Sequence, residues 1–217
     1  LLTENEAEGL YQFSDGSLAT LASTTQAIDV FGTPRTYSEF LDPVVNGAGD
    51  LAVLATEALG DLQTILHRDS SGVWSIVAQT DMQAPGAQSG VTFNILSSPH
   101  LNGNGQVAFQ ASLSGSGDSI SDTTDTGAWA TDSNGFLALV ARAGDTIEVR
   151  PSFPATIKSA TISGFNTANQ IALNYSFTNG ASAIAIVGLA DILPPSIAEQ
   201  PASETSYDGE TVILSVE

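Results

Sequence analysis

The sequence predicts an all-β protein built from tandem, blade-like, four-stranded antiparallel units, and three observations support this prediction. No segment sustains an apolar period of 3.6 residues, whereas several short segments alternate apolar and polar residues. Turn dipeptides that favour a positive φ angle separate pairs of these segments. The turns and the strands beside them recur about every 60 residues, which is typical of a repeat protein.

Three hairpins are predicted, each around a turn that ends in glycine. The turn pairs are Asp15-Gly16, Ser71-Gly72 and Asn134-Gly135, and their glycines are 56 and 63 residues apart. Gly, Asn and Asp tolerate the positive φ angle that tight hairpin turns require. The flanking apolar strands are Leu10–Phe13 with Leu18–Leu21, Ile65–His67 with Val73–Ala78, and Ala128–Ala130 with Phe136–Ala141.

A second landmark, a turn that begins with asparagine, recurs in phase with the hairpins. Its asparagines are Asn46, Asn102 and Asn166, which are 56 and then 64 residues apart. Alternation with a period of two in the last two following strands predicts one buried and one polar face. These strands are Leu51–Ala55, Gln106–Leu113 and Gln170–Phe177, and the linking segments add Tyr37–Leu41, Val91–Leu96 and Thr156–Ile162.

The landmarks divide the chain into units of about four strands. The units span residues 9–61, 62–125 and 126–181, and the strand Ala183–Leu189 begins a partial unit at 182–190. We therefore expect a β-repeat domain over residues 1–190 and a linker with an extended β segment over 191–217. Three units are fewer than the roughly four to eight blades of a closed propeller. A propeller-like piece of a longer array, an open β-repeat and a sandwich remain open alternatives.

The best copy of the repeat carries a family resemblance. Asn102–Phe109 reads Asn-x-x-Gly-x-Val-Ala-Phe, and Gly127–Trp129 and Gly135–Asp145 add Gly-x-Trp and Gly-x-Leu-x-Leu-Val-Ala-Arg-x-Gly-Asp. This pattern resembles tandem repeats of large secreted or surface-anchored bacterial proteins, and it covers residues 9–189. The third copy departs from it at Ala168-Asn169, where the glycine is absent. The resemblance implies blade-like units at the bacterial cell surface and no particular activity.

Residues 191–217 resemble the start of a bacterial immunoglobulin-like domain. They contain a Pro-Pro linker, a Gln-Pro-Ala-Ser stretch, an Asp-Gly turn and a Thr-Val-x-Leu-Ser-Val strand. A complete sandwich needs about 100 residues, so this strand alone requires another sheet to pair with. It either pairs within its own chain or adds to a sheet edge of a neighbouring molecule. The residues of this assembly strand are Val212, Ile213, Leu214, Ser215 and Val216.

The charge balance excludes several classes of partner. The 217 residues include 24 acidic and 5 basic side chains, which gives a formal net charge of -19. The basic residues are scattered singly, whereas nucleic-acid binding needs clustered Lys and Arg to neutralise phosphates. An anionic membrane surface repels such a chain, and no apolar stretch approaches the roughly 18 residues of a membrane helix. The absence of Cys excludes disulfides, thiol catalysis and Cys-zinc sites.

One loop is a weak candidate for a calcium site. Asp118, Asp122 and Asp125 lie within eight residues, with Ser and Thr oxygens between them, and Ca²⁺ prefers such oxygen ligands. The spacing of an EF-hand and its bidentate Glu are absent, so a solvated acidic loop is the simpler interpretation. No other cofactor is expected.

No motif indicates catalysis. His67 and His100 lack metal-binding spacing, and we expect them at the surface or at strand edges. Trp74 and Trp129 occupy matching strand positions and are expected to pack in the core instead of binding sugars. The sequon Asn174-Tyr-Ser lies in a predicted strand, where glycosylation is not expected.

The sequence therefore favours a non-enzymatic structural or assembly module of an extracellular bacterial surface protein or filament. Its subunits would associate with each other, or with other surface proteins, by β-strand addition through the C-terminal segment. The alternative is a glycan- or cell-surface-binding adhesion module, with calcium as its candidate cofactor. A hydrolase with a pair of carboxylates is a third hypothesis, and it would require a pocket that holds both.

Overall fold

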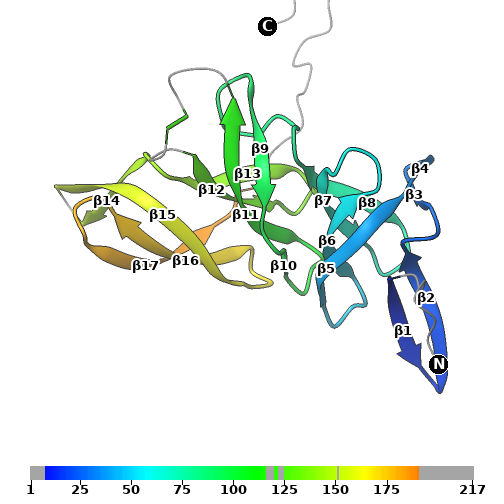
Figure 1. The fold of residues 1–217 in the computed structure, drawn as a ribbon. Helices are drawn as coiled ribbons and strands as arrows, with labels where there is room; N and C mark the ends of the chain where they lie inside the picture. The colour runs from blue at the N-terminus through cyan, green and yellow to red at the C-terminus, as the bar shows by residue number, and fades with distance from the viewer. Residues whose placement is uncertain (1–7, 116–119, 122–124, 151, 191–217) are drawn as a thin grey trace, which may run out of the picture.

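The structure is all-β, as predicted. It is a computed structural model that describes residues 8–115, 120–121, 125–150 and 152–190, and it contains 17 strands and no helix among them. The strands form four sheets, which follow one another along an elongated body (Figure 1). The sheets are antiparallel apart from one parallel contact between Val30 and Trp74.

We call the six-stranded sheet the first, the five-stranded sheet the second and the four-stranded sheet the third. The first and the second sheet each contain a four-stranded meander. In the first sheet the meander runs through β5 (Tyr37–Val45), β6 (Leu51–Glu57), β7 (Gln63–Arg68) and β8 (Trp74–Gln79). In the second it runs through β9 (Val91–Leu96), β11 (Val107–Gly115), β12 (Thr126–Thr131) and β13 (Leu137–Arg142). The asparagine-led turn joins β5 to β6 in the first sheet, and in the second it joins β10 (His100–Leu101), which like β9 pairs with β11, to β11. The glycine hairpin joins the last two strands of each meander.

The third sheet has only part of this meander among the described residues. It contains β15 (Phe153–Phe165), β16 (Gln170–Phe177) and β17 (Ser182–Gly188), with β14 (Thr146–Arg150) on the other side of β15. β17 corresponds to β7 and β12, which each have a neighbour on both sides. β17 pairs with β16 alone among the described residues.

The hairpin of β1 (Gly9–Ser14) and β2 (Ser17–Ser23) matches the outer half of a meander. Leu10 and Ala22 pack against the first sheet, just as Ile65 and Ala78 pack against the second. The tip of this hairpin projects away from the body (Figure 1), and its Phe13 is 73% exposed. The N-terminal hairpin and the first two sheets are therefore arranged by the same packing rule.

The hairpin and asparagine-turn strands lie where the sequence predicts them, and the linking strands do too. Four strands were not predicted: β3 (Ile28–Val30), β4 (Thr33–Arg35), β10 (His100–Leu101) and β14. They contain two to five residues, which is too few to display an alternating pattern. The structure bears out the all-β class and the antiparallel sheets but does not confirm a propeller-like arrangement.

The core consists of three hydrophobic clusters, and each cluster lies at a junction between successive sheets. At the junction of the first two sheets Trp129 is fully buried, with ring centroids 5.0 Å from Phe93 and 6.2 Å from Phe109. Its indole Nε1 donates to the carbonyl of Pro85 at 2.9 Å. Trp74 is also buried, so both tryptophans pack in the core as predicted.

Tyr37 on β5 carries a buried hydroxyl that has no hydrogen-bond partner among the described residues. Burial raises the pKa of Tyr37 to about 12, with a further contribution from the Glu57 carboxylate and opposition from Arg35. Glu57 is engaged elsewhere, because its Oε1 accepts from Arg35 Nη1 and from Gln79 Nε2. The hydroxyl therefore loses its solvation without compensation.

We predict that Tyr37→Phe raises the free energy of unfolding by about 1 kcal/mol, because removing an unpaired buried hydroxyl removes its desolvation cost. Urea unfolding at neutral pH measures the change. Tyr175→Phe is the matched control. Unlike the Tyr37 hydroxyl, the Tyr175 hydroxyl is not both buried and without a hydrogen-bond partner. Destabilisation by Tyr37→Phe would contradict the assignment.

Candidate functional site

The three asparagine-led turns share one hydrogen-bonding pattern. Asn102 Oδ1 accepts from the backbone N–H groups of Asn104 at 3.0 Å and Gln106 at 2.9 Å. Asn46 and Asn166 hold the groups two and four residues ahead in the same way. The fourth residue of each turn has a positive φ angle, and in the third turn Asn169 takes the place of glycine. The side chain of the first asparagine thus fixes the turn.

The same side chains also join neighbouring units. Asn46 Nδ2 donates to the carbonyl of Asn102 at 3.0 Å, and Asn102 Nδ2 donates to the carbonyl of Asn166 at 2.9 Å. We call this series the asparagine ladder. In the glycine hairpins Asp69 and Asp132 accept from the backbone with the same geometry. A carboxylate has no N–H to donate, so only asparagine can form the ladder.

The ladder is completed in the middle and open at its end. Asn102, which has a unit on each side, is 2% exposed, whereas Asn46 is half-buried and Asn166 is exposed. Asn166 Nδ2 donates to Gln170 Oε1 at 3.0 Å within its own turn. Among the described residues it reaches no carbonyl of a further unit. Asn166 therefore presents the donor that its two counterparts use to bind the next unit.

The sheet face beside this open rung is uncovered as well. The residues eight and six positions after each turn asparagine lie directly opposite residues of the following strand. In the first two sheets six of these eight side chains are buried, and Gln110 and His67 are half-buried. In the third sheet Ile184 is 79% and Ile186 71% exposed. The equivalent pairs are Leu54–Ile65, Gln110–Ala128 and Asn174–Ile184, and then Ala52–His67, Ala108–Ala130 and Ala172–Ile186.

Gln110 shows what such a face binds. Its Nε2 donates to the carbonyl of Ala160 at 3.1 Å, and its Oε1 accepts from the N–H of Ile162 at 3.3 Å. Both ends of the Gln110 carboxamide therefore bind the backbone of β15 in the third sheet. Asn174 occupies the equivalent position in the third sheet and is exposed. It carries the same carboxamide chemistry on the uncovered face.

The free edge of β17 borders this face. β17 contains no charged residue, although natural edge strands are usually protected by charge or by proline. We define the open end as Asn166, Asn174, Ile184 and Ile186 together with the free edge of β17. It offers two carboxamides, two apolar side chains and a strand edge that has no partner within the described residues.

The predicted site residues fall mostly outside the part of the chain that the structure describes. The structure does not describe Asp118, Asp122 or the assembly strand Val212–Val216. The calcium and donor-strand hypotheses therefore remain predictions. Asp125 is described, and its carbonyl accepts from the Leu113 N–H at 2.6 Å. Within the described ranges no three His, Cys, Asp or Glu side chains are grouped to hold a metal ion. These ranges also contain no helix of the length and hydropathy that crossing a membrane requires.

The sequence did not indicate that Asn166 and Asn174 lie exposed at the open end, or that His67 is covered by the turn of the next unit. His67 lies on β7, where the turn of the second unit covers it, and its Nε2 is buried without a partner among the described residues. Burial lowers the pKa of His67, while the nearby Asp50 and Asp69 carboxylates oppose the shift. Burial also lowers the pKa of His100 on β10. A usable signal for the ladder was present, since asparagine leads every linking turn and aspartate leads the equivalent hairpins at residues 69 and 132.

The sheets, their shared junctions and the ladder define an all-β tandem-repeat protein. Residues 2–198 match the "Family of unknown function (DUF7453)", and the chain belongs to that family. No curated protein matches the chain, and no solved structure matches it.

We predict that Asn102→Asp destabilises the protein by about 2 kcal/mol. The aspartate keeps the acceptor of the turn but loses both donors, and its charge is buried against the Asn166 carbonyl. Asn166→Asp is the matched control, and it should change stability by less than about 0.5 kcal/mol because its side chain is exposed. Urea unfolding compares the two, and equal losses would show that the contact between units contributes nothing.

We also predict that stability falls as the pH drops below about 6.5, the ordinary pKa of histidine. His67 and His100 have lowered pKa values in the folded protein, so the unfolded chain binds more protons in this range. Their contribution is complete above that pH and is lost on acidification. His67→Gln should reduce the difference in unfolding free energy between pH 7.5 and about 5.5. An unchanged difference would exclude His67 as a source.

Proposed function

We propose that this chain is a non-enzymatic assembly module whose open end is completed by a β-strand of a neighbouring molecule. The observation that carries the proposal is the exposure of Ile184 and Ile186 at positions where the preceding sheets are covered. Burying both side chains would contribute roughly 2 kcal/mol each. Backbone pairing along β17 would add affinity, as in other cases of strand addition.

The assembly strand Val212–Val216 is the proposed donor. It is uncharged and apolar apart from Ser215, and its five residues can pair along β17, which has seven. At a net charge of -19, copies of the chain repel one another over most of their surface. An uncharged strand and an uncharged edge are therefore the places where two copies can approach at the lowest electrostatic cost.

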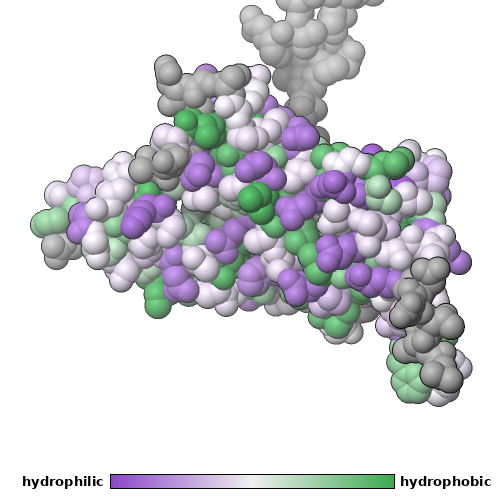
Figure 2. Space-filling model, viewed as in Figure 1, coloured by the Kyte–Doolittle hydropathy of each residue, from purple (hydrophilic) through white to green (hydrophobic). Residues whose placement is uncertain are grey.

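Donation to the next molecule in one direction gives a head-to-tail contact, which generates a filament unless the rotation closes a ring. Figure 2 shows hydrophilic and hydrophobic residues interspersed over the face in view, with no broad hydrophobic area. Such a surface favours association through a few defined strands. We propose the bacterial cell surface as the location of this assembly, because a composition rich in Ser, Thr, Gly and Asn with little Lys resembles that of secreted bacterial surface proteins.

The test uses the full chain and sedimentation velocity over a wide range of concentration. The wild type should associate as concentration rises. Leu214→Pro should abolish association, because proline removes a backbone donor from the strand. Ile184→Lys with Ile186→Lys should abolish it too, because charge is placed beside the edge. Ile95→Lys on β9 is the control, since Ile95 is also exposed on a strand but lies in the second sheet.

A mixture of the two inactive variants separates exchange between molecules from pairing within one chain. The Leu214→Pro variant keeps an intact edge, and the double lysine variant keeps an intact donor. Together they should form a one-to-one complex that grows no further. A wild type that stays monomeric at every concentration, or association that survives Leu214→Pro, would overturn the proposal.

A further inference from the structure

A groove of about 470 Å³ lies where the first and second sheets meet. His67 and Ser75 line it from the first sheet, and Asn104 and Gln106 line it from the asparagine-led turn of the second. The β12–β13 turn closes another side, and Phe31 of the β3–β4 turn stands at its rim. Its volume falls within the range of small-molecule binding sites.

Phe31 is held in a conformation that a bulky residue rarely adopts. Its φ angle is 49°, followed by 79° at Gly32, so the two form a two-residue hairpin turn between Val30 and Thr33. Such turns prefer Asn, Asp or Gly at both positions. The β1–β2 hairpin uses Asp15 and Gly16 with nearly the same angles of 51° and 78°. Phenylalanine thus occupies a position where a less strained choice exists in the same chain.

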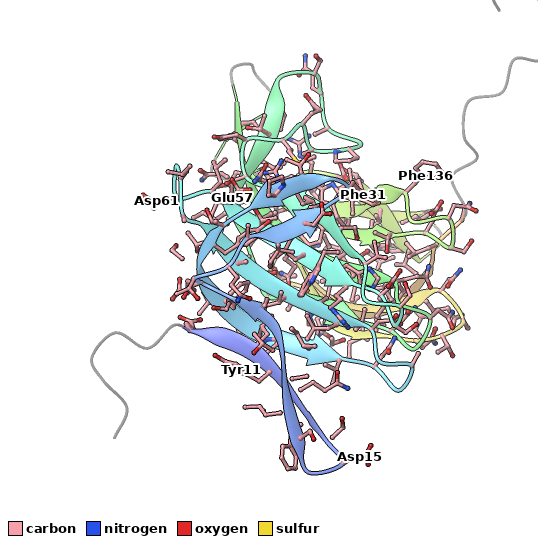
Figure 3. All side chains as sticks on the ribbon, turned by 90° about the vertical axis from the view of Figure 1, so that its right-hand side faces the viewer. Tyr11, Asp15, Phe31, Glu57, Asp61 and Phe136 are labelled. Carbon is pink, nitrogen blue, oxygen red and sulfur yellow. The ribbon has the colours of Figure 1, made fainter. Side chains whose placement is uncertain are left out.

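The strained residue is also exposed. Phe31 is 78% exposed, and a second hollow of about 400 Å³ lies on its other side, against Trp74. Figure 3 shows Phe31 and Phe136 on the same side of the molecule, carried by different turns. Neither burial nor backbone preference accounts for an aromatic side chain at position 31.

The groove is preformed and largely uncharged. Gln106 Nε2 donates to the Thr131 carbonyl at 3.2 Å, and Gln106 Oε1 accepts from Asn102 at 2.8 Å. Asn104 is exposed, with its Nδ2 on the carbonyl of Thr167 at 2.8 Å. Among the described residues that line the groove none is Lys or Arg, and Asp132 adds a carboxylate. The lining therefore disfavours anions and suits a neutral ligand with several hydroxyl groups.

We propose that this groove binds a neutral saccharide. The apolar face of a sugar ring stacks on Phe31, and its hydroxyls exchange hydrogen bonds with the Asn104 carboxamide and the Ser75 hydroxyl. Rigid aromatic anchors beside satisfied polar groups are typical of binding sites, because little flexibility is lost on binding. This site lies apart from the open end, so it is independent of the proposed assembly.

The probe is an array of neutral, sialylated and sulfated oligosaccharides, incubated with the full chain. Binding should be confined to neutral members. For a member that binds, Phe31→Ala should weaken the affinity by about tenfold or more, as truncation of an aromatic anchor does. Phe13→Ala is the matched control, since Phe13 is 73% exposed on the N-terminal hairpin, outside the groove. It should leave binding unchanged.

Phe31→Asn distinguishes a functional residue from a merely tolerated one. Asparagine accepts the positive φ angle, so this variant should raise the urea midpoint while it weakens saccharide binding. Leu214→Pro should still bind, which separates this site from assembly. Failure of the wild type to bind any neutral member, or equal binding by Phe31→Ala, would overturn the proposal. Binding to a Lys- and Arg-rich peptide that salt abolishes, with no saccharide binding, would do so too.

Discussion

The packing of each unit on the next depends on the hydrogen bond from the side chain of one turn asparagine to the carbonyl of the following turn asparagine. The side chain uses its oxygen to close its own turn and its nitrogen to hold the neighbour. Closing the turn sets the register of the strand that follows, and a slip of one residue would reverse its buried and exposed faces. The turn and the junction are therefore specified by a single residue, Asn102 in the buried case.

The ladder also gives the array a direction. At each rung of the ladder the donor lies on the N-terminal unit and the acceptor on the C-terminal one. Gln110 likewise extends its side chain from the second sheet to the backbone of β15 in the third. A unit that no described unit follows must then display uncovered features of a known kind. Asn166, Asn174, Ile184 and Ile186 are these features, and each has a buried or half-buried counterpart in the second sheet. The open end is thus a regular junction face that lacks its cover.

The sequence predicts the strands better than it predicts the surfaces between them. Period-two alternation and the glycine turns locate every long strand, because both are local properties. The covering of a face is not local. Ala128 and Ile184 occupy equivalent positions, yet their burial depends on whether another unit packs on them. Phe31 could not be recognised either, because β3 and β4 have three residues each and show no period.

The ladder and the groove depend on the same turn. Asn104, Gly105 and Gln106 line the groove, and the Asn102 side chain fixes their backbone. The equivalent surface of the next junction has Ala130 in place of His67 and Ala168 in place of Asn104. Repetition therefore builds the same scaffold at each junction, and substitutions within it confine the polar lining to the first one. A repeat protein can in this way carry a binding site at one position while its remaining surfaces serve assembly.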